Sequence, residues 1–214
     1  MIQAFKNWAA GLSRPRMGRR MAALFLGITM MGFCVAMLDR LGFGTDPCST
    51  VNLGVSRTIG WSFGTWQLTV NILMLLIVIR YDLGRIGLGT LVNMVGVGYA
   101  AEFFMMIFDR IPWLSAMGFG MRLIVFVPTL ALLLFSAATY MVCDLGVAPY
   151  DAIPQIIAGR TGKAFRLVRT LWDLSMLTIG FLFGATVGPT TFGVAFFLGP
   201  LVAYLGRKME PFFN

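Results

Sequence analysis

The sequence predicts an all-α integral membrane protein in which six transmembrane helices form two inverted-topology repeats of three helices. Three observations lead to this fold class: a composition poor in charge, a series of long apolar stretches, and a set of short motifs that occurs twice. Of the 214 residues, 58% are hydrophobic and 12% are charged, whereas soluble domains average about 45–50% apolar and about 25% charged residues. So little charge cannot cover a water-soluble globule, which argues against a soluble enzyme, a nucleic-acid reader and a disordered regulator.

Each apolar stretch approaches the length that a membrane span requires, which is about 20 apolar residues at 1.5 Å per residue. The predicted spans are residues 21–38, 63–79, 86–108, 123–142, 165–183 and 190–205. The predicted organisation is a basic arm (1–20), a first repeat (21–108), an external loop (109–122), a second repeat (123–206) and a tail (207–214).

Basic residues indicate the orientation of the spans. When the predicted spans cross in alternate directions, 13 of the 17 Lys and Arg residues fall on the side of the N-terminus. Cytoplasmic loops carry such an excess, so both termini are predicted to be cytoplasmic. The net charge of +8 therefore serves topology and contact with anionic lipid headgroups rather than nucleic acid. The first apolar stretch is long and ends at Asp39-Arg40, which favours an uncleaved span over a signal peptide.

An internal repeat relates the two halves of the sequence. The loop at 41–60 aligns with the loop at 145–162 once two residues are removed from the first, so that Gly42 meets Gly146. The Gly-Leu-Gly-Thr segment at 87–90 likewise meets Gly-Pro-Thr-Thr at 188–191. Each unit contains three spans, an odd number, so the second copy enters the membrane from the opposite side. Inverted repeats of this kind are typical of many secondary transporters.

The two aligned loops are predicted to contain short interfacial or re-entrant helices, because they are moderately apolar yet too short to span. Pro47 and Pro149 suit the first position of a helix, which places Ser49 and Asp151 in the first turn. Free N–H groups at such a terminus attract anions, and broken helices in transporters bind substrate in this way. A surface helix without a ligand is the alternative.

Polar residues inside the predicted spans are the candidate functional groups, because they are costly in hydrocarbon. Arg169 and Asp173 lie one helical turn apart in the fifth span, and the aligned Gln67 and Asn71 have the same spacing in the second. These four residues are predicted to form one polar cluster between the repeats. Trp66 and Trp172 are predicted to line it. The alternative is an interhelical hydrogen-bond clamp that holds the two halves together.

Glu102 in the third span is predicted to bind a cation or proton, or else to lie near the outer headgroups. Asp173 is the other candidate proton site. The sequence contains no His and three widely spaced Cys residues, so we predict no metal site and no cofactor.

The repeated motifs resemble those of the YczE/YyaS/YitT group of bacterial inner-membrane proteins. The likeness rests on the Leu-Gly-x-Ala/Gly…Pro-x-Asp/Ser loop, the following Thr-Gly turn and the Gly-x-Gly-Thr opening of the third span, from about residue 21 to 206. The sequence departs from this pattern at Cys48-Ser49, where the second copy has Tyr150-Asp151, and at Gly188-Pro189-Thr190-Thr191. The resemblance implies a short YczE-like member without a soluble C-terminal domain, located in the bacterial inner membrane. It implies no biochemical activity.

The expected function is a small secondary transporter or facilitator for a small solute or anion bound near the membrane midplane. Two alternatives stay open: a membrane-embedded substrate-binding subunit of an ATP-driven importer, and a non-transporting structural or assembly protein. An enzyme is not expected, because no nucleophile–base pair or metal motif is present. The expected partners are the lipid bilayer and an unknown small solute, with a homodimer as a further candidate and no nucleic acid.

Overall fold

The computed structural model describes residues 16–213, and all regular secondary structure in that part of the chain is helical. The longer helices are α2 (Met17–Leu41), α4 (Phe63–Tyr81), α5 (Leu88–Asp109), α7 (Phe119–Val142), α9 (Phe165–Leu182) and α10 (Pro189–Met209). The shorter ones are α3 (Pro47–Ile59), η1 (Leu83–Arg85), α6 (Pro112–Ser115), α8 (Pro149–Thr161) and η2 (Glu210–Phe212). Each predicted span therefore corresponds to one of the longer helices, with ends that differ by a few residues.

Four of these helices, α2, α4, α5 and α7, are long and apolar enough to cross a membrane. Their outward-facing side chains are large and hydrophobic, as Leu73 and Leu76 on α4 illustrate with 58% exposure each. α9, predicted as the fifth span, is 18 residues long and carries Arg166, Arg169 and Asp173. The described residues thus establish a membrane protein with four candidate spans.

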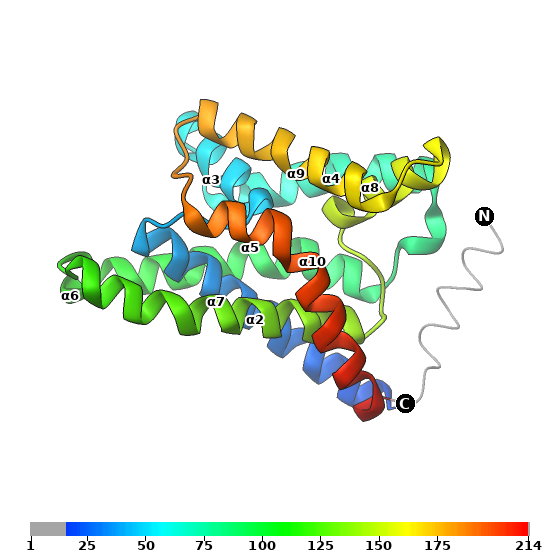
Figure 1. Cartoon of the computed structure of the whole chain (residues 1–214), viewed down its shortest axis with the longest axis horizontal. Helices are drawn as coiled ribbons and strands as arrows, with labels where there is room; N and C mark the ends of the chain where they lie inside the picture. Colours follow the sequence, from blue (N-terminus) through cyan, green and yellow to red (C-terminus); the bar gives the residue numbers. More distant parts are fainter. Residues whose placement is uncertain (1–15, 214) are drawn as a thin grey trace.

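The helices pack in two groups that lie side by side (Figure 1). In the first group, α2 packs against α5 and α7, and α10 packs against α7. In the second group, α3 packs against α9, while α8 packs against both α4 and α9. α4 and α5 join the groups, where Val35, Leu53, Phe63 and Ala101 form a buried apolar cluster. Each short helix, α3 or α8, is therefore enclosed by helices from both halves of the sequence.

Small residues allow the close approach of α2 and α5. A Cβ atom added at Gly32 would lie 2.5 Å from the Cβ of Ala100 and 2.8 Å from the backbone nitrogen of Ala101. Helices in membranes rely on such contacts because lipid leaves little hydrophobic drive for association.

We expect Gly32→Ala to destabilise the protein by about 2 kcal/mol, because the methyl group overpacks the contact between α2 and α5. The midpoint of unfolding in detergent measures the effect. Gly120→Ala in α7 is the matched control, since a Cβ there meets nothing within 4 Å. Equal midpoints for the two variants would contradict the close approach.

The two loops that precede α3 and α8 each bind the start of a long helix in the other half of the sequence. Leu145 accepts a hydrogen bond from the Gly89 backbone at 2.7 Å, and Phe43 accepts one from the Thr190 backbone at 3.2 Å. Gly146 at φ 114° and Gly44 at φ 83° adopt the left-handed region beside these contacts. These loops therefore tie the halves together.

The start of α2 contacts the end of the chain. Arg20 is 5% exposed and donates to the carbonyls of Cys143 at 3.0 Å and Phe213 at 2.9 Å. The basic arm predicted at 1–20 thus differs from the structure at its end, because α2 already begins at Met17. The rest of that arm lies outside the described residues. A buried guanidinium is tolerated here because carbonyl oxygens satisfy it.

Candidate functional site

A buried ion-pair cluster joins the beginning of α8 to the middle of α9. Arg169 donates through Nε to Asp173 at 2.8 Å and through Nη1 to Asp151 at 2.6 Å. The hydroxyl of Tyr150 donates to the second oxygen of Asp173 at 2.7 Å. The guanidinium also lies 5.2 Å from the centre of the Tyr150 ring. One cation, two carboxylates and a phenol thus form a continuous network.

Local sequence explains this arrangement. Arg169 and Asp173 are four residues apart, so they meet on one face of α9. Pro149 occupies the start of α8, where its missing N–H costs nothing. The following Tyr150 and Asp151 therefore project from the first turn of α8, which packs against α9.

The cluster is buried on one side and accessible on the other. The Asp173 side chain is 4% exposed, whereas those of Arg169 and Asp151 are 24% and 22% exposed. Hydrogen bonds between charged groups in such a low-dielectric place are strong, and a partner left without its counter-charge is costly. Arg169 and Asp151 therefore form the partly exposed side of the network.

The beginning of α3 faces the same network from the other half of the sequence. Asp46 caps α3 by accepting a hydrogen bond from the Ser49 backbone at 3.0 Å. Burial raises the pKa of Asp46, its hydrogen bonds with Ser49 lower it, and the nearby Asp151 carboxylate raises it. Asp151 at the start of α8 therefore acts electrostatically on the carboxylate that caps α3.

The predicted first-turn residues Ser49 and Asp151 are therefore both engaged. The Ser49 N–H already binds a carboxylate of the protein, and Asp151 pairs with Arg169. Both short helices begin at the predicted prolines, Pro47 and Pro149. A free anion site at these termini, as the sequence suggested, would have to compete with these carboxylates.

The aligned polar residues of α4 are buried but are not bonded to the network. Gln67 is 4% exposed and Asn71 is 5% exposed. Gln67 lies against Gly98 of α5, and its Oε1 has no hydrogen-bond partner. Among the described residues, no hydrogen bond joins Gln67 or Asn71 to Arg169 or Asp173. The structure thus brings together only half of the predicted cluster by direct contact.

The two predicted lining tryptophans have different surroundings. Trp172 lies beside Tyr150, with ring centres 5.8 Å apart, and packs on the apolar cluster of α4 and α8. Trp66 instead contacts Trp61 at 6.1 Å. The indole N–H groups of Trp66 and Trp172 are both buried without a partner. Trp172 therefore belongs to the surroundings of the network, whereas Trp66 contacts an exposed residue at the start of α4.

Glu102 caps a helix. Its Oε2 accepts a hydrogen bond from the Gly64 backbone at 2.9 Å, in the first turn of α4. A carboxylate at a helix N-terminus is favoured by the helix dipole and by the free N–H groups there. Glu102 thus joins α5 to α4, a role that the sequence analysis did not consider.

We expect Glu102→Ala to destabilise the protein by about 1–2 kcal/mol through loss of this cap. Glu102→Gln, which keeps an acceptor oxygen, should retain much of the stability. Unfolding midpoints in detergent measure both. If instead both variants were as stable as the wild type, the cap would be irrelevant to the fold.

Two residues of the site were not identified from the sequence. Tyr150 appeared only as a departure from the family motif, and Asp46 was not singled out. Asp46 directly precedes a proline at the first position of a helix, a pattern typical of an N-cap. That signal was available, whereas the contact between Tyr150 and Asp173 depends on tertiary packing.

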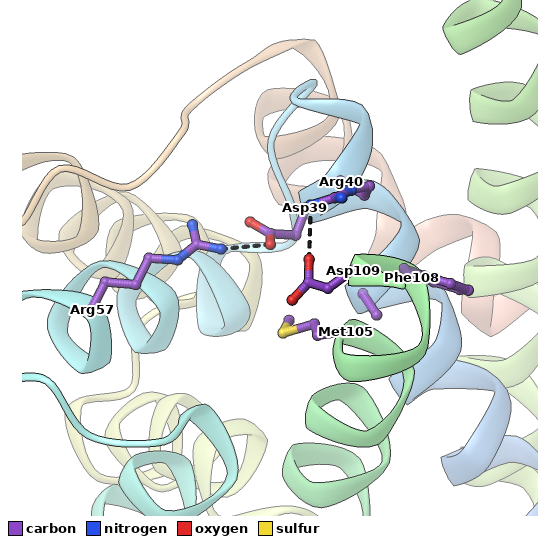
Figure 2. A pocket seen from close by; sticks show the side chains of 7 residues that line it. Asp39, Arg40, Arg57, Met105, Phe108 and Asp109 are labelled. Atoms are coloured by element: carbon purple, nitrogen blue, oxygen red, sulfur yellow. Dashed lines mark hydrogen bonds and ion pairs between the residues drawn. The ribbon is translucent and has the colours of Figure 1, made fainter. Parts of the chain in front are cut away.

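A second polar cluster lies at the opposite end of α3, around a small cavity of about 130 Å³. Figure 2 shows Arg57 of α3 reaching Asp39 of α2 at 2.6 Å, and Arg40 reaching Asp109 of α5 at 2.9 Å. Arg40 also donates to Ser115 at 2.6 Å. The Asp109 side chain is 67% exposed, so these are surface ion pairs that contribute little stability individually.

Comparison with known proteins identifies relatives but no activity. The profile of a family of unknown function (DUF6198) matches residues 18–207. An uncharacterized protein of Haemophilus influenzae is 25% identical over 198 residues, which cover 92% of this chain and 88% of the relative. The uncharacterized membrane protein YczE of Bacillus subtilis is 24% identical, with 84% and 82% covered. The uncharacterized protein YyaS of the same organism is 23% identical, with 76% and 80% covered. No solved structure matches the chain.

Proposed function

This chain belongs to the DUF6198 family of unknown function, and we propose that it is a small secondary transporter or facilitator. Its solute binds at the Arg169 network, between two halves inserted in opposite directions. One observation carries the proposal: a charged network within an apolar protein, in which the first turn of α8 meets Arg169 and Asp173 of α9. Ionisable groups within a membrane protein commonly mark solute or ion pathways.

Matched contacts support the inverted repeat. Phe43 and Leu145 accept equivalent hydrogen bonds, and each adjoins a left-handed glycine, Gly44 or Gly146. A Cβ at Gly44 would meet Gly188, and a Cβ at Gly146 would meet Gly87. Gly44 rather than Gly42 is thus the counterpart of Gly146, so the loops align without the gap that the sequence comparison introduced. The short helices are related in the same way: α3 of the first half packs on α9 of the second, and α8 of the second half packs on α4 of the first.

Six spans are consistent with the positions of the chain ends. Arg20 near the start of α2 contacts Phe213, which supports an even number of crossings between these two residues. In our proposal α9 and α10 supply the fifth and sixth crossings. Arg169 and Asp173 in α9 are paired with each other, and Arg166 is exposed and long enough to extend toward the headgroups. The excess of Lys and Arg assigns both ends to the cytoplasm, in the bacterial inner membrane.

The short helices have the length of half-spans. Each has 13 residues, or about 20 Å, against a hydrocarbon core of about 30 Å. The far end of α3 contacts the end of α9 through Thr58 and Phe183, at 3.1 Å. The far end of α8 contacts the end of α4, where Arg160 lies 4.4 Å from the centre of the Tyr81 ring. In the six-span topology these ends lie at opposite membrane faces, so the N-termini meet between them as in other transporters with broken helices.

In this scheme, transport results from competition between the solute and the ion pair of Arg169 with Asp151. A solute that reaches the exposed edge of Arg169 and Asp151 replaces part of their mutual contact, which weakens the tie between α8 and α9. Because α8 connects to one membrane face and α3 to the other, such a change alternately opens the site to each side. No covalent step and no cofactor take part in this scheme.

The test uses the purified full-length protein in proteoliposomes loaded with a bacterial metabolite extract, because the solute is unidentified. Mass spectrometry measures which compounds leave the vesicles relative to protein-free liposomes. We expect at least one compound to be released by the wild type and retained with Arg169→Gln and Asp173→Asn. Arg166→Gln and Asp109→Asn, at exposed positions, are the matched controls and should release it normally.

Two outcomes would contradict the proposal. Release that persists unchanged in Arg169→Gln and Asp173→Asn would remove this network from transport. Absence of any protein-dependent release, combined with destabilisation by Asp173→Asn, would favour an interhelical clamp in a structural or assembly protein.

A further inference from the structure

Two guanidinium groups converge on one aromatic ring where α4 and α8 end. Arg80 lies 5.6 Å and Arg160 lies 4.4 Å from the centre of the Tyr81 ring. α4 and α8 pack against each other, and both finish at the same end of the molecule (Figure 1). All three residues are exposed. The ring attracts each cation, so two like charges are held close together although they repel each other.

The packing beneath the ring fixes this arrangement. Val78 of α4 is 1% exposed and belongs to one buried apolar cluster with Ile153 and Ile156 of α8. This contact lies within a few residues of Arg80 along α4 and of Arg160 along α8. The two guanidinium groups are therefore brought together by contacts between the two halves of the sequence.

No carboxylate of the protein balances this pair of charges. Among the described residues, neither Arg80 nor Arg160 forms an ion pair. Asp82, which follows Tyr81 in the sequence, is paired with Arg85 at 2.7 Å. The second polar cluster differs, because each of its arginines reaches an aspartate. The surplus positive charge beside Tyr81 therefore favours an anion from outside the chain.

An apolar strip on α4 leads directly to Arg80. Leu73, Leu76 and Ile77 are exposed, and their spacing places them on the same helix face as Arg80. α4 is a candidate membrane span, so this face meets lipid. Tyrosines are common at the headgroup level of a membrane protein, which is where Tyr81 ends the span. The anion that fits here is one with an apolar portion beside it.

We propose that Arg80 and Arg160 bind the phosphate of an anionic phospholipid, whose acyl chains lie along the strip of Leu73, Leu76 and Ile77. Guanidinium groups suit phosphate because they donate two parallel hydrogen bonds. Basic sites between membrane helices bind anionic headgroups in this way. A soluble phosphate would gain nothing from the apolar strip. The lipid site is separate from the Arg169 network and does not depend on the proposed transport.

The experiment is native mass spectrometry of the purified full-length protein released from detergent micelles. The probes are phosphatidylglycerol and phosphatidylethanolamine with identical acyl chains, and ammonium phosphate as a soluble competitor. Phosphatidylglycerol should bind at lower concentration than phosphatidylethanolamine, because only its headgroup has a net negative charge. Excess ammonium phosphate should not displace it. Equal binding of the two lipids would overturn the inference, as would displacement by phosphate, which would indicate a soluble ligand.

Variants assign the binding to this site. We expect Arg80→Gln and Arg160→Gln each to weaken phosphatidylglycerol binding about fivefold, the effect of one basic residue at an anionic surface. Tyr81→Leu should weaken it as well, whereas Tyr81→Phe keeps the ring and should bind normally. Arg110→Gln is the matched control, because Arg110 is exposed at the end of α5, another candidate span. Gel filtration checks that each variant is folded. Equal weakening by Arg110→Gln would show a general attraction between a basic protein and anionic lipid, which would contradict a specific site.

Discussion

Arg169→Met is expected to destabilise the protein by about 3–5 kcal/mol, because it leaves the buried carboxylate of Asp173 and the half-buried carboxylate of Asp151 without their counter-charge. Asp173 is 3% exposed, so water cannot replace the lost guanidinium. Methionine keeps much of the side-chain volume, which limits the loss to charge and hydrogen bonding. Unfolding in detergent, followed by circular dichroism, measures the change.

Two further variants separate this explanation from general damage to α9. Asp173→Asn combined with Arg169→Met should be more stable than Arg169→Met alone, since one of the stranded charges is removed. Arg166→Met, on the exposed part of α9, should leave stability within about 0.5 kcal/mol of the wild type. A double variant no more stable than the single one would show that the ion pairs do not account for the effect.

Gly44→Ala and Gly146→Ala should each lower the free energy of unfolding by about 3 kcal/mol. Both residues have positive φ, which costs about 1–2 kcal/mol for alanine. Both also approach another helix: a Cβ at Gly146 would lie 2.5 Å from the Gly87 nitrogen, and a Cβ at Gly44 2.7 Å from the Gly188 nitrogen. Overpacking of this kind adds about 1–3 kcal/mol.

Each half of the chain offers a matched control for that pair. Gly60 and Gly162 also have positive φ, of 73° and 65°, but a Cβ at either meets nothing within 4 Å. Gly60→Ala and Gly162→Ala should therefore show the backbone strain alone, about 1–2 kcal/mol. If all four variants were equally destabilised, the loops would not be pressed against the opposite half.

Hydrophobic stretches and helix signals sufficed to predict the helices, because lipid imposes both length and composition on them. Pro47 and Pro149 likewise identified the starts of the short helices, since proline is favoured at the first helical position. The pairing of Arg169 with Asp173 followed from their spacing along one helix. Each of these features depends on a single segment of the chain, so it could be predicted from the sequence of that segment.

Contacts between distant segments could not be predicted in the same way. Tyr150 reaches Asp173 only because α8 packs on α9. Glu102 of α5 caps α4, and no sequence motif links this residue to the start of α4. Gln67 shares the register of Arg169, yet it packs on Gly98 because glycine leaves room there for its side chain. Equivalent positions in two repeats therefore need not have equivalent partners.

The central claim is that the two halves enter the membrane from opposite sides, with α3 and α8 as opposed half-spans. Ile59 and Thr161, at the far ends of these helices, are both exposed. In a variant with Cys34, Cys48 and Cys143 replaced by alanine, single cysteines are introduced by Ile59→Cys or Thr161→Cys. A membrane-impermeant maleimide is then applied to intact cells and to inverted vesicles. We predict that position 59 reacts from the outside only and position 161 from the cytoplasmic side only. Reaction of both positions from the same side would contradict the inverted architecture and the transport mechanism that depends on it.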